Sequence, residues 1–293
     1  MKYFDRLHPI STFVYFFVMI LVAMLTMHPV IITVCYATGI IFCGMLTGLK
    51  NLVKSLAYSI PLTVLIAITN PIFSHKGETI LFFLNDNPVT KEAIIYGVFS
   101  AMMLMSVFYW CRNYSTVMTS DKFIYLFGRI IPKLSLVLSL ILGFIPKLKR
   151  KYREIDEAQR ALGIYSSQSY VDKIRSKMRV LSILLTNSLE NSVETADSMR
   201  ARGYGLKNRT SYAVYRFNFS DGLFLVSTVF LGIVSIILII FGEAEYNFYP
   251  TLMQVDLAAI SCVLYICIAL LGLLSVFTEV KENVLWRYLK SKI

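Results

Sequence analysis

Charged side chains are scarce in this sequence, and its long apolar stretches are almost free of them. Only 16% of the 293 residues are Asp, Glu, Lys or Arg, whereas 56% are hydrophobic. A single water-soluble core of this length cannot bury so much apolar surface. The composition therefore argues against an ordinary soluble domain and indicates a chain whose solvent is the lipid bilayer.

The sequence also lacks the residue sets that metal and nucleotide sites need. Its cysteines form no CxxC pair, its histidines stand at unrelated spacings, and no GxxxxGK[ST] phosphate loop occurs. We therefore assign no catalytic residue, cofactor or metal, and interpret the cysteines as small apolar packing residues. The residues concerned are Cys35, Cys43, Cys111, Cys262 and Cys267, with His8, His28 and His75.

Six apolar stretches are long enough, at about 18 residues or more, to cross roughly 30 Å of hydrocarbon as helices. Two shorter apolar runs fit other places: Leu134–Ile145, between two prolines, predicts an interfacial or protein-buried helix, and Ile80–Leu84 is expected against the outer face. The pattern predicts an all-α membrane protein with about six transmembrane helices. The predicted spans are Ile10–Met27, Val30–Leu49, Ser55–Phe73, Ala93–Cys111, Gly222–Gly242 and Leu257–Thr278.

Lysine and arginine concentrate in one part of the chain. From Arg112 to Ser220 there are nineteen Lys and Arg against eight Asp and Glu, a net charge of +11 that equals that of the whole chain. Cytosolic loops retain such residues, so this segment and both termini are predicted to be cytoplasmic in a multi-pass bacterial cell membrane protein. The predicted organisation is 1–112 for transmembrane helices 1 to 4, 113–220 for cytosolic helices, and 221–293 for transmembrane helices 5 and 6. Membrane lipid, and no nucleic acid, is the expected anionic neighbour.

The cytosolic segment predicts two helices. The first is the charged run Lys147–Leu162, stopped by Gly163, and the second starts near Ser169 and ends at Gly203. Small residues in the second helix, Ser188, Ser192 and Ala196, predict that another helix approaches closely there, which favours a crossed pair of long helices over a solvated hairpin folded on itself. Apolar or small residues recur every three or four positions as one stripe, at Val171, Ile174, Met178, Leu181, Leu185, Ser188, Ser192, Ala196 and Met199.

No Asp, Glu, Lys, Arg or His lies well inside any of the six predicted spans. A transporter with its own solute path, or an intramembrane enzyme, needs ionisable or polar groups at that depth to hold a substrate or move a proton. We therefore expect that this chain offers no solute pathway of its own.

The run from Ala196 to Gly205 carries the most specific signal in the sequence. It places Arg200 and Arg202 in the last turn of a helix with Gly203 beyond, where guanidinium groups complement the helix dipole and can turn outward to a carboxylate. Followed by Arg209 and Thr210, this run resembles that of the T component of energy-coupling-factor transporters. These transporters are the vitamin- and metal-importing branch of ABC transporters.

The resemblance covers nearly the whole chain and implies a coupling subunit that is not an enzyme. It implies that two cytosolic ABC ATPase subunits bind the two helix ends, and that their ATP-driven closure changes the angle between the crossed helices. That motion would tilt a separate small membrane subunit, which binds the vitamin or metal ion. By the same resemblance, Arg202 is the anchor for one ATPase, with Arg200, Ala201 and Gly203 beside it.

The end of the first helix departs from the family pattern. Leu162 stands where the family has an arginine, and Arg160 is the candidate to substitute for it in docking, beside Ala161 and Gly163. Arg160 comes two residues before Leu162, and its direction on a helix differs by about 200°. The two helix ends are therefore expected to be unequal, the second being the stronger.

Two other classes of protein fit the sequence less well. The coupling loop of a conventional ABC permease is matched loosely by Glu157, Ala158, Gly163 and Ile174, but no Leu-Pro follows. A membrane-bound enzyme could use acidic side chains of the cytosolic helices, yet a solvated face that offsets neighbouring arginines explains them. These are Asp156, Glu157, Glu190, Glu194 and Asp197.

Overall fold

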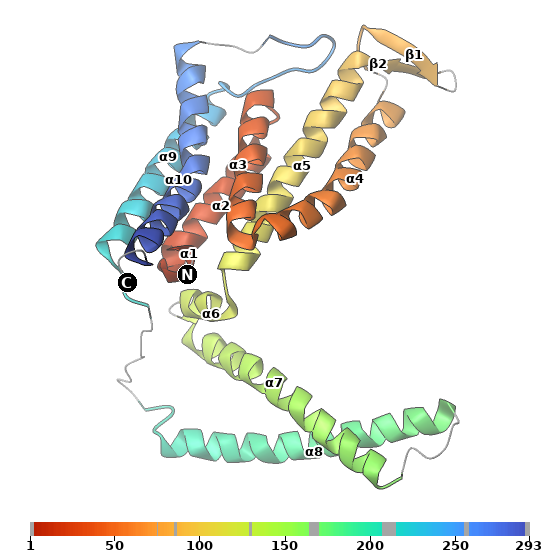
Figure 1. Cartoon of the computed structure of the whole chain (residues 1–293), viewed down its shortest axis with the longest axis vertical. Coiled ribbons are helices and arrows are strands. Elements are labelled where there is room, and N and C mark those ends of the chain that lie inside the picture. The colour runs from red at the N-terminus through yellow and green to blue at the C-terminus, as the bar shows by residue number, and fades with distance from the viewer. Residues whose placement is uncertain are drawn as a thin grey trace. The chain divides into compact units, whose positions relative to one another are not determined.

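The computed structural model of the chain describes residues 3–74, 76–84, 87–128, 131–163, 170–206, 215–254 and 258–290. In these residues the backbone forms ten α-helices and one two-stranded hairpin (Figure 1). The chain divides into two compact units. The first, here called the apolar unit, comprises Met1–Lys122 and Tyr215–Ile293, and the second, the helix-pair unit, comprises Phe123–Val214.

Six long helices make up most of the apolar unit. Five of them are long and apolar enough to cross a membrane, and the sixth, α2, is a shorter apolar helix of 17 residues. Each corresponds to one predicted stretch, so the prediction of an all-α membrane protein is confirmed. The helices are α2 (Pro9–Leu25), α3 (Pro29–Thr47), α4 (Leu49–Phe73), α5 (Lys91–Val117), α9 (Phe219–Ile240) and α10 (Ala259–Lys290), preceded by the short α1 (Tyr3–Arg6).

A β-hairpin follows α4 and precedes α5. Its strand β1 (Ile80–Leu84) pairs antiparallel with β2 (Asn87–Thr90). The sequence placed this apolar run outside the spans but gave no sign that it pairs as a strand. The carboxylate of Glu92, in the first turn of α5, accepts a hydrogen bond from the Thr79 hydroxyl at 2.6 Å, which ties the hairpin to the helix.

Aromatic side chains fill the centre of the apolar unit. Trp110 of α5 is fully buried, and its indole N–H donates to the carbonyl oxygen of Cys35 in α3 at 3.0 Å. One turn further on, the amide of Asn113 donates to the carbonyl oxygen of Gly39 at 3.0 Å. Phe42 stacks on Trp110 with 6.1 Å between ring centroids. A buried polar side chain needs a partner, so these two bonds fix α5 against α3.

Glycines allow the helices of this unit to approach one another closely. A Cβ atom added to Gly272 in α10 would lie 2.8 Å from the hydroxyl oxygen of Thr38 in α3. One added to Gly232 in α9 would lie 2.6 Å from a methyl carbon of Val18 in α2. Small residues at such contacts are typical of membrane helices, because lipid chains give no hydrophobic drive and close packing must supply the attraction.

Two buried charged side chains hold the places where the chain leaves the apolar unit and returns to it. The Lys122 ammonium donates to the carbonyl oxygen of Phe4 at 2.7 Å. The Asp221 carboxylate forms a capping box at the start of α9, accepting from the backbone N–H of Asn218 at 3.0 Å, and also accepts from that of His8 at 3.2 Å. The bonds from Lys122 to Phe4 and from His8 to Asp221 join residues that are far apart in sequence, so the N-terminal segment is fixed from two sides.

The helix-pair unit is built on α7 (Pro132–Ala161) and α8 (Tyr170–Ala201), which pack across each other after the short α6 (Ser120–Gly128) (Figure 1). The sequence separated an apolar helix from a charged one at Pro146, and this boundary was wrong, because α7 is continuous through it. A proline removes one backbone hydrogen bond, and the strong helix formers on both sides carry the helix past it. The predicted crossed pair of long helices is confirmed.

We predict that Gly272→Val destabilises the apolar unit by roughly 1 to 3 kcal/mol, because the new methyl groups would collide with Thr38 across the α10–α3 contact. The matched control is Leu273→Val, which places the same residue one position further along at an exposed site. Thermal unfolding of both purified variants in detergent measures the difference. Equal melting temperatures for the two variants would contradict the inferred close packing.

Candidate functional site

The C-terminal end of α8 closes in a defined hydrogen-bonded turn. Gly203 has φ of 78°, in the left-handed region that favours glycine. Its N–H donates to the carbonyl oxygen of Arg200 at 2.9 Å, and the N–H of Tyr204 donates to that of Met199 at 2.9 Å. This pair of bonds is the Schellman motif, which satisfies carbonyl groups that a helix end otherwise leaves open.

The C-terminal end of α7 repeats the glycine conformation and the first of these two bonds. Gly163 has φ of 73°, and its N–H donates to the carbonyl oxygen of Arg160 at 3.0 Å. The two termini therefore correspond in register as Arg-Ala-x-Gly. Arg160 corresponds to Arg200 and Ala161 to Ala201, followed by Leu162 opposite Arg202 and Gly163 opposite Gly203.

This register changes the interpretation of Arg160. The sequence offered Arg160 as a substitute for the arginine missing at position 162, but its structural counterpart is Arg200. Arg160 also forms an ion pair at 2.9 Å with Asp156, one turn earlier in α7. The i, i+4 spacing of Asp156 and Arg160 is typical of an ion pair on one face of a helix, so the sequence already contained the signal for this contact.

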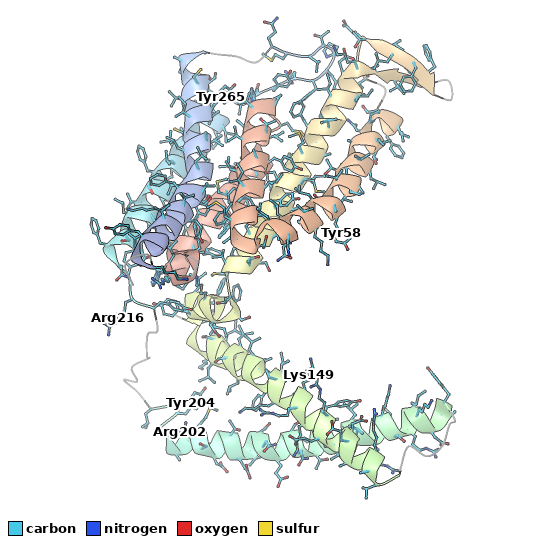
Figure 2. The ribbon with its side chains drawn as sticks, in the orientation of Figure 1. Tyr58, Lys149, Arg202, Tyr204, Arg216 and Tyr265 are labelled. Atoms are coloured by element: carbon cyan, nitrogen blue, oxygen red, sulfur yellow. The ribbon has the colours of Figure 1, made fainter. Side chains whose placement is uncertain are left out.

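The residues at the third position of the motif differ sharply in chemistry. Leu162 is 75% exposed, an apolar side chain in water at the tip of α7. Arg202 is also exposed, and in the described part of the chain it has no ion-pair partner or side-chain hydrogen bond, while Arg200 lies 3.9 Å from Asp197. Figure 2 shows Arg202 and Tyr204 together at the end of α8. A guanidinium group left free in this way can form a bidentate bond with a partner's carboxylate.

The helices cross near the end of α7 but far from the end of α8. The most buried side chains are Ile155 and Gln159 in α7 with Ser176 and Val180 in α8, and both pairs have the spacing of one helical turn. The small residues predicted to pack, Ser188, Ser192 and Ala196, lie further along α8. There Ser188 and Ala196 are half-buried and Ser192 is exposed. Their stretch of α8 borders an open cleft, while the tightest contact is nearer the N-terminal end of the helix.

The apolar stripe predicted for α8 does not cover α7. Val171, Ile174, Met178, Leu181 and Leu185 are between 43% and 64% exposed. The periodicity was correct as a pattern, but the buried residues Ser176 and Val180 lie on another face of the helix. A row of large apolar side chains exposed on a long helix is a surface that suits a partner or lipid.

The remaining candidates form no second site in the described residues. Nowhere among them do three or more His, Cys, Asp or Glu side chains gather where they could hold a metal ion. Glu190, Glu194 and Asp197 are exposed along α8, and none of the five cysteines forms a disulfide bond. Five residues named in the sequence analysis, His75, Ser169, Arg209, Thr210 and Leu257, lie outside the described residues.

Comparisons with known proteins identify relatives of this chain. A family model described as "CbiQ: Cobalt transport protein" matches residues 6–212. The chain is similar to proteins named "Energy-coupling factor transporter transmembrane protein EcfT". That of Listeria innocua is 28% identical over 181 residues, which cover 58% of this chain and 68% of the relative.

Two streptococcal proteins of the same name give shorter or similar matches. The Streptococcus thermophilus protein is 33% identical over 104 residues, 35% of this chain and 39% of the relative. The Streptococcus equi protein is 28% identical over 178 residues, 55% of this chain and 65% of the relative. The alignments thus span from about two fifths to two thirds of the length of these relatives.

We predict that Gly203→Ala loosens the end of α8, because an L-residue at this φ costs roughly 1 to 2 kcal/mol. Hydrogen–deuterium exchange of the peptide that contains Tyr204 should accelerate by about fivefold or more. Gly143→Ala is the control, since Gly143 lies within α7 with open space around it. Unchanged exchange around Tyr204 in Gly203→Ala would show that the Schellman motif does not hold this terminus.

Proposed function

The chain belongs to the CbiQ family of cobalt transport proteins, and from that premise we propose that it is the transmembrane coupling subunit of an energy-coupling-factor importer. Such a chain is the membrane component of a transporter and not an enzyme. In our proposal, two cytosolic ABC ATPases dock on the ends of α7 and α8. A separate small membrane subunit binds the substrate, a vitamin or a metal ion.

The observation that carries this proposal is the repeated terminus. Two long helices that cross end in the same Arg-Ala-x-Gly turn, and both tips are exposed. A pair of related ATPases needs two similar docking surfaces, one for each subunit. A solute path or a catalytic site has no need of such a repeat, so the geometry favours the coupling role over that of a conventional permease.

The crossed helices can act as a lever. The crossing residue Ile155 lies about 9 Å from the docking end of α7 but about 34 Å from its first residue, at 1.5 Å of rise per residue. A movement of the ATPase at the short arm would therefore be enlarged roughly fourfold at the apolar start of the helix. Continuity through Pro146 makes this possible, because a break there would absorb the motion.

We propose that the two docking contacts differ in chemistry. At α8, the free guanidinium of Arg202 enters an acidic groove of one ATPase and forms the stronger anchor. At α7, the ion pair with Asp156 holds the Arg160 side chain against the helix, so the side chain that projects is Leu162. The second ATPase must therefore offer an apolar surface to Leu162. The two ATPases are therefore distinguishable by what each presents to the helix tip.

The orientation and the substrate subunit complete the proposal. The excess of lysine and arginine between Arg112 and Ser220 favours a cytosolic position for that segment and for both termini. The exposed apolar face of α8 that includes Ile174, Met178 and Leu185 supplies a surface for the substrate subunit. Choice between vitamins and metal ions then belongs to that subunit and not to this chain.

We predict that Arg202→Ala weakens association with the ATPases by about 30-fold, the effect of losing roughly 2 kcal/mol from a desolvated arginine. The variant should still be inserted in the membrane, because Arg202 makes no contact that supports the fold in the described residues. Co-purification of the ATPases and substrate uptake measure the loss. Lys50→Ala, which removes an exposed charge from α4 in the apolar unit, is the control. Unchanged co-purification and uptake in Arg202→Ala would refute this assignment.

We predict that Leu162→Arg lowers ATPase association instead of improving it. Although the variant restores the family pattern, it puts a charge against an apolar surface, where desolvation is not repaid by a carboxylate. Leu162→Met, which keeps size and polarity, should behave like the unmodified chain. Tighter binding of the ATPases to Leu162→Arg would show that the α7 groove is acidic, and that the two contacts have the same chemistry.

A further inference from the structure

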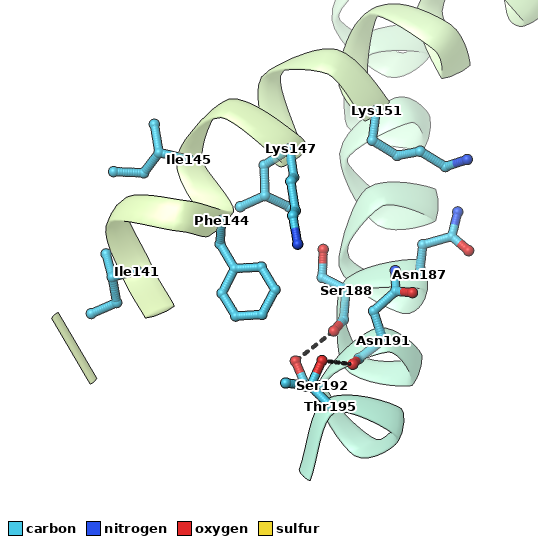
Figure 3. A pocket seen from close by; sticks show the side chains of 11 residues that line it. Ile141, Phe144, Ile145, Lys147, Lys151, Asn187, Ser188, Asn191, Ser192 and Thr195 are labelled. Atoms are coloured by element: carbon cyan, nitrogen blue, oxygen red, sulfur yellow. Dashed lines mark hydrogen bonds between the residues drawn. The ribbon is translucent and has the colours of Figure 1, made fainter. Parts of the chain in front are cut away.

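An open cleft of about 490 Å³ lies between α7 and α8, beyond their crossing point (Figure 3). Its α7 side carries the apolar side chains Ile141, Phe144 and Ile145, followed along the helix by Lys147, Leu148 and Lys151. Its α8 side is polar and consists of amide and hydroxyl side chains. The cleft thus changes from apolar to cationic along its length. It lies away from the two docking tips, and no role assigned above uses it.

The polar groups of the cleft are suited to an anion. Lys147 lies with its ammonium 5.8 Å from the centre of the Phe144 ring, and no carboxylate lines the cleft in the described residues. Lys151 pairs with Glu154 at 3.3 Å, but both side chains are about half exposed, so this pair is weak. On α8, the amides of Asn187 and Asn191 have no side-chain hydrogen bond in the described part of the chain and are available as donors.

The hydroxyl groups beside these amides are already committed as donors. Ser192 donates to the carbonyl oxygen of Ser188 at 2.6 Å, and Thr195 to that of Asn191 at 2.6 Å, as the dashed lines of Figure 3 show. Ser188 donates in the same way to Leu184 at 2.6 Å. The amides and the two lysines therefore define where an anionic group would be held.

The polarity of α7 identifies the kind of molecule. Before Pro146 most of its side chains are apolar and several are exposed, among them Leu134 at 47% and Val137 at 48%. From Lys147 to Arg153, five of seven residues are lysine or arginine. This step from apolar to cationic within one turn matches the step from acyl chain to phosphate in a lipid. A soluble anion would have no use for the apolar half of the cleft.

We propose that this cleft binds one anionic glycerophospholipid. Its phosphodiester is held by Lys147 and Lys151 with an amide from Asn187 or Asn191, and an acyl chain lies along Ile141, Phe144 and Ile145. An anionic headgroup is selected over a zwitterionic one, because the cleft offers no carboxylate for a choline or ethanolamine cation. This inference does not depend on ATPase docking, which involves the helix tips.

The experiment places a fluorescent probe in the cleft. The full chain carrying Phe144→Trp is reconstituted in nanodiscs of phosphatidylcholine that contain an equal mole fraction of either brominated phosphatidylglycerol or brominated phosphatidylcholine. Bromine quenches tryptophan at short range, and the unmodified chain gives the background from Trp110 and Trp286. We expect stronger quenching by brominated phosphatidylglycerol.

Two double variants separate a built site from a diffuse basic surface. Lys147→Gln with Lys151→Gln should reduce the preference for phosphatidylglycerol by roughly fivefold for each lysine, the factor that corresponds to about 1 kcal/mol. Lys149→Gln with Arg150→Gln removes the same charge from the same helix outside the cleft and should leave the preference largely unchanged. Figure 2 labels Lys149, which is exposed on α7.

Three results would overturn the proposal. Equal quenching by the two brominated lipids would show no headgroup selection, and equal losses in both double variants would show only a diffuse basic surface. Absence of quenching by either lipid would mean that protein or water occupies the cleft. If Phe144→Trp fails to fold, native mass spectrometry of the otherwise unmodified chain and both double variants gives the same comparison. The proposal then requires bound phosphatidylglycerol that is lost only from Lys147→Gln with Lys151→Gln.

Discussion

The structure depends first on the rule that every backbone polar group at membrane depth must find its partner within the protein. In a bilayer only helices or closed barrels meet this rule, and the six apolar helices of this chain meet it helix by helix. What remains for side chains is to join the helices, with packing as the main attraction. Gly272 against Thr38 and the bonds from Trp110 and Asn113 to carbonyl groups of α3 do this by close approach and by a few satisfied polar contacts.

The helix-pair unit differs from the apolar unit, because it leaves a row of large apolar side chains exposed. Its crossing buries few side chains, chiefly Ile155 and Val180, while the apolar residues of α8 such as Met178 remain exposed. A soluble domain would bury that face to stabilise itself. In a subunit that works with partners, the same face can be used by them, which explains why the sequence pattern is strongly amphipathic and the isolated fold leaves it open.

Most of the helices could be predicted from the sequence, because apolar length and glycine or proline boundaries act locally. The predicted span Val30–Leu49, for example, became Pro29–Thr47. Three features could not be predicted. Pro146 stays within α7, because a helix tolerates one lost hydrogen bond. The apolar stripe of α8 faces away from α7, and the periodicity of a sequence does not say which face of a helix meets which neighbour. The strand pairing of Ile80–Leu84 depends on a partner strand elsewhere in the chain.

The candidate site illustrates how a local motif and its register carry different information. The family resemblance indicated that Leu162 replaces an arginine, and suggested Arg160 as its substitute. The matching turns at Gly163 and Gly203 show instead that Arg160 has a counterpart in Arg200, so nothing in α7 replaces Arg202. A hydrogen-bonded turn sets the direction of each side chain near it, and a shift of two residues along the helix turns a side chain by about 200°.

The unequal tips and the continuous α7 bear on how force could pass through this chain. If Leu162 makes the weaker contact, the tip of α7 can shift on its partner while Arg202 keeps α8 fixed, so one helix pivots and the other serves as its base. The pivot lies at Ile155 and Val180, close to the tip of α7. A lipid held at Lys147 and Lys151 would then sit on the long arm, between the pivot and the apolar start of the helix. There the lipid would couple the motion of α7 to the membrane surface and would limit how far α7 can rotate about the pivot. The contacts between α7 and α8 alone do not provide this link to the membrane.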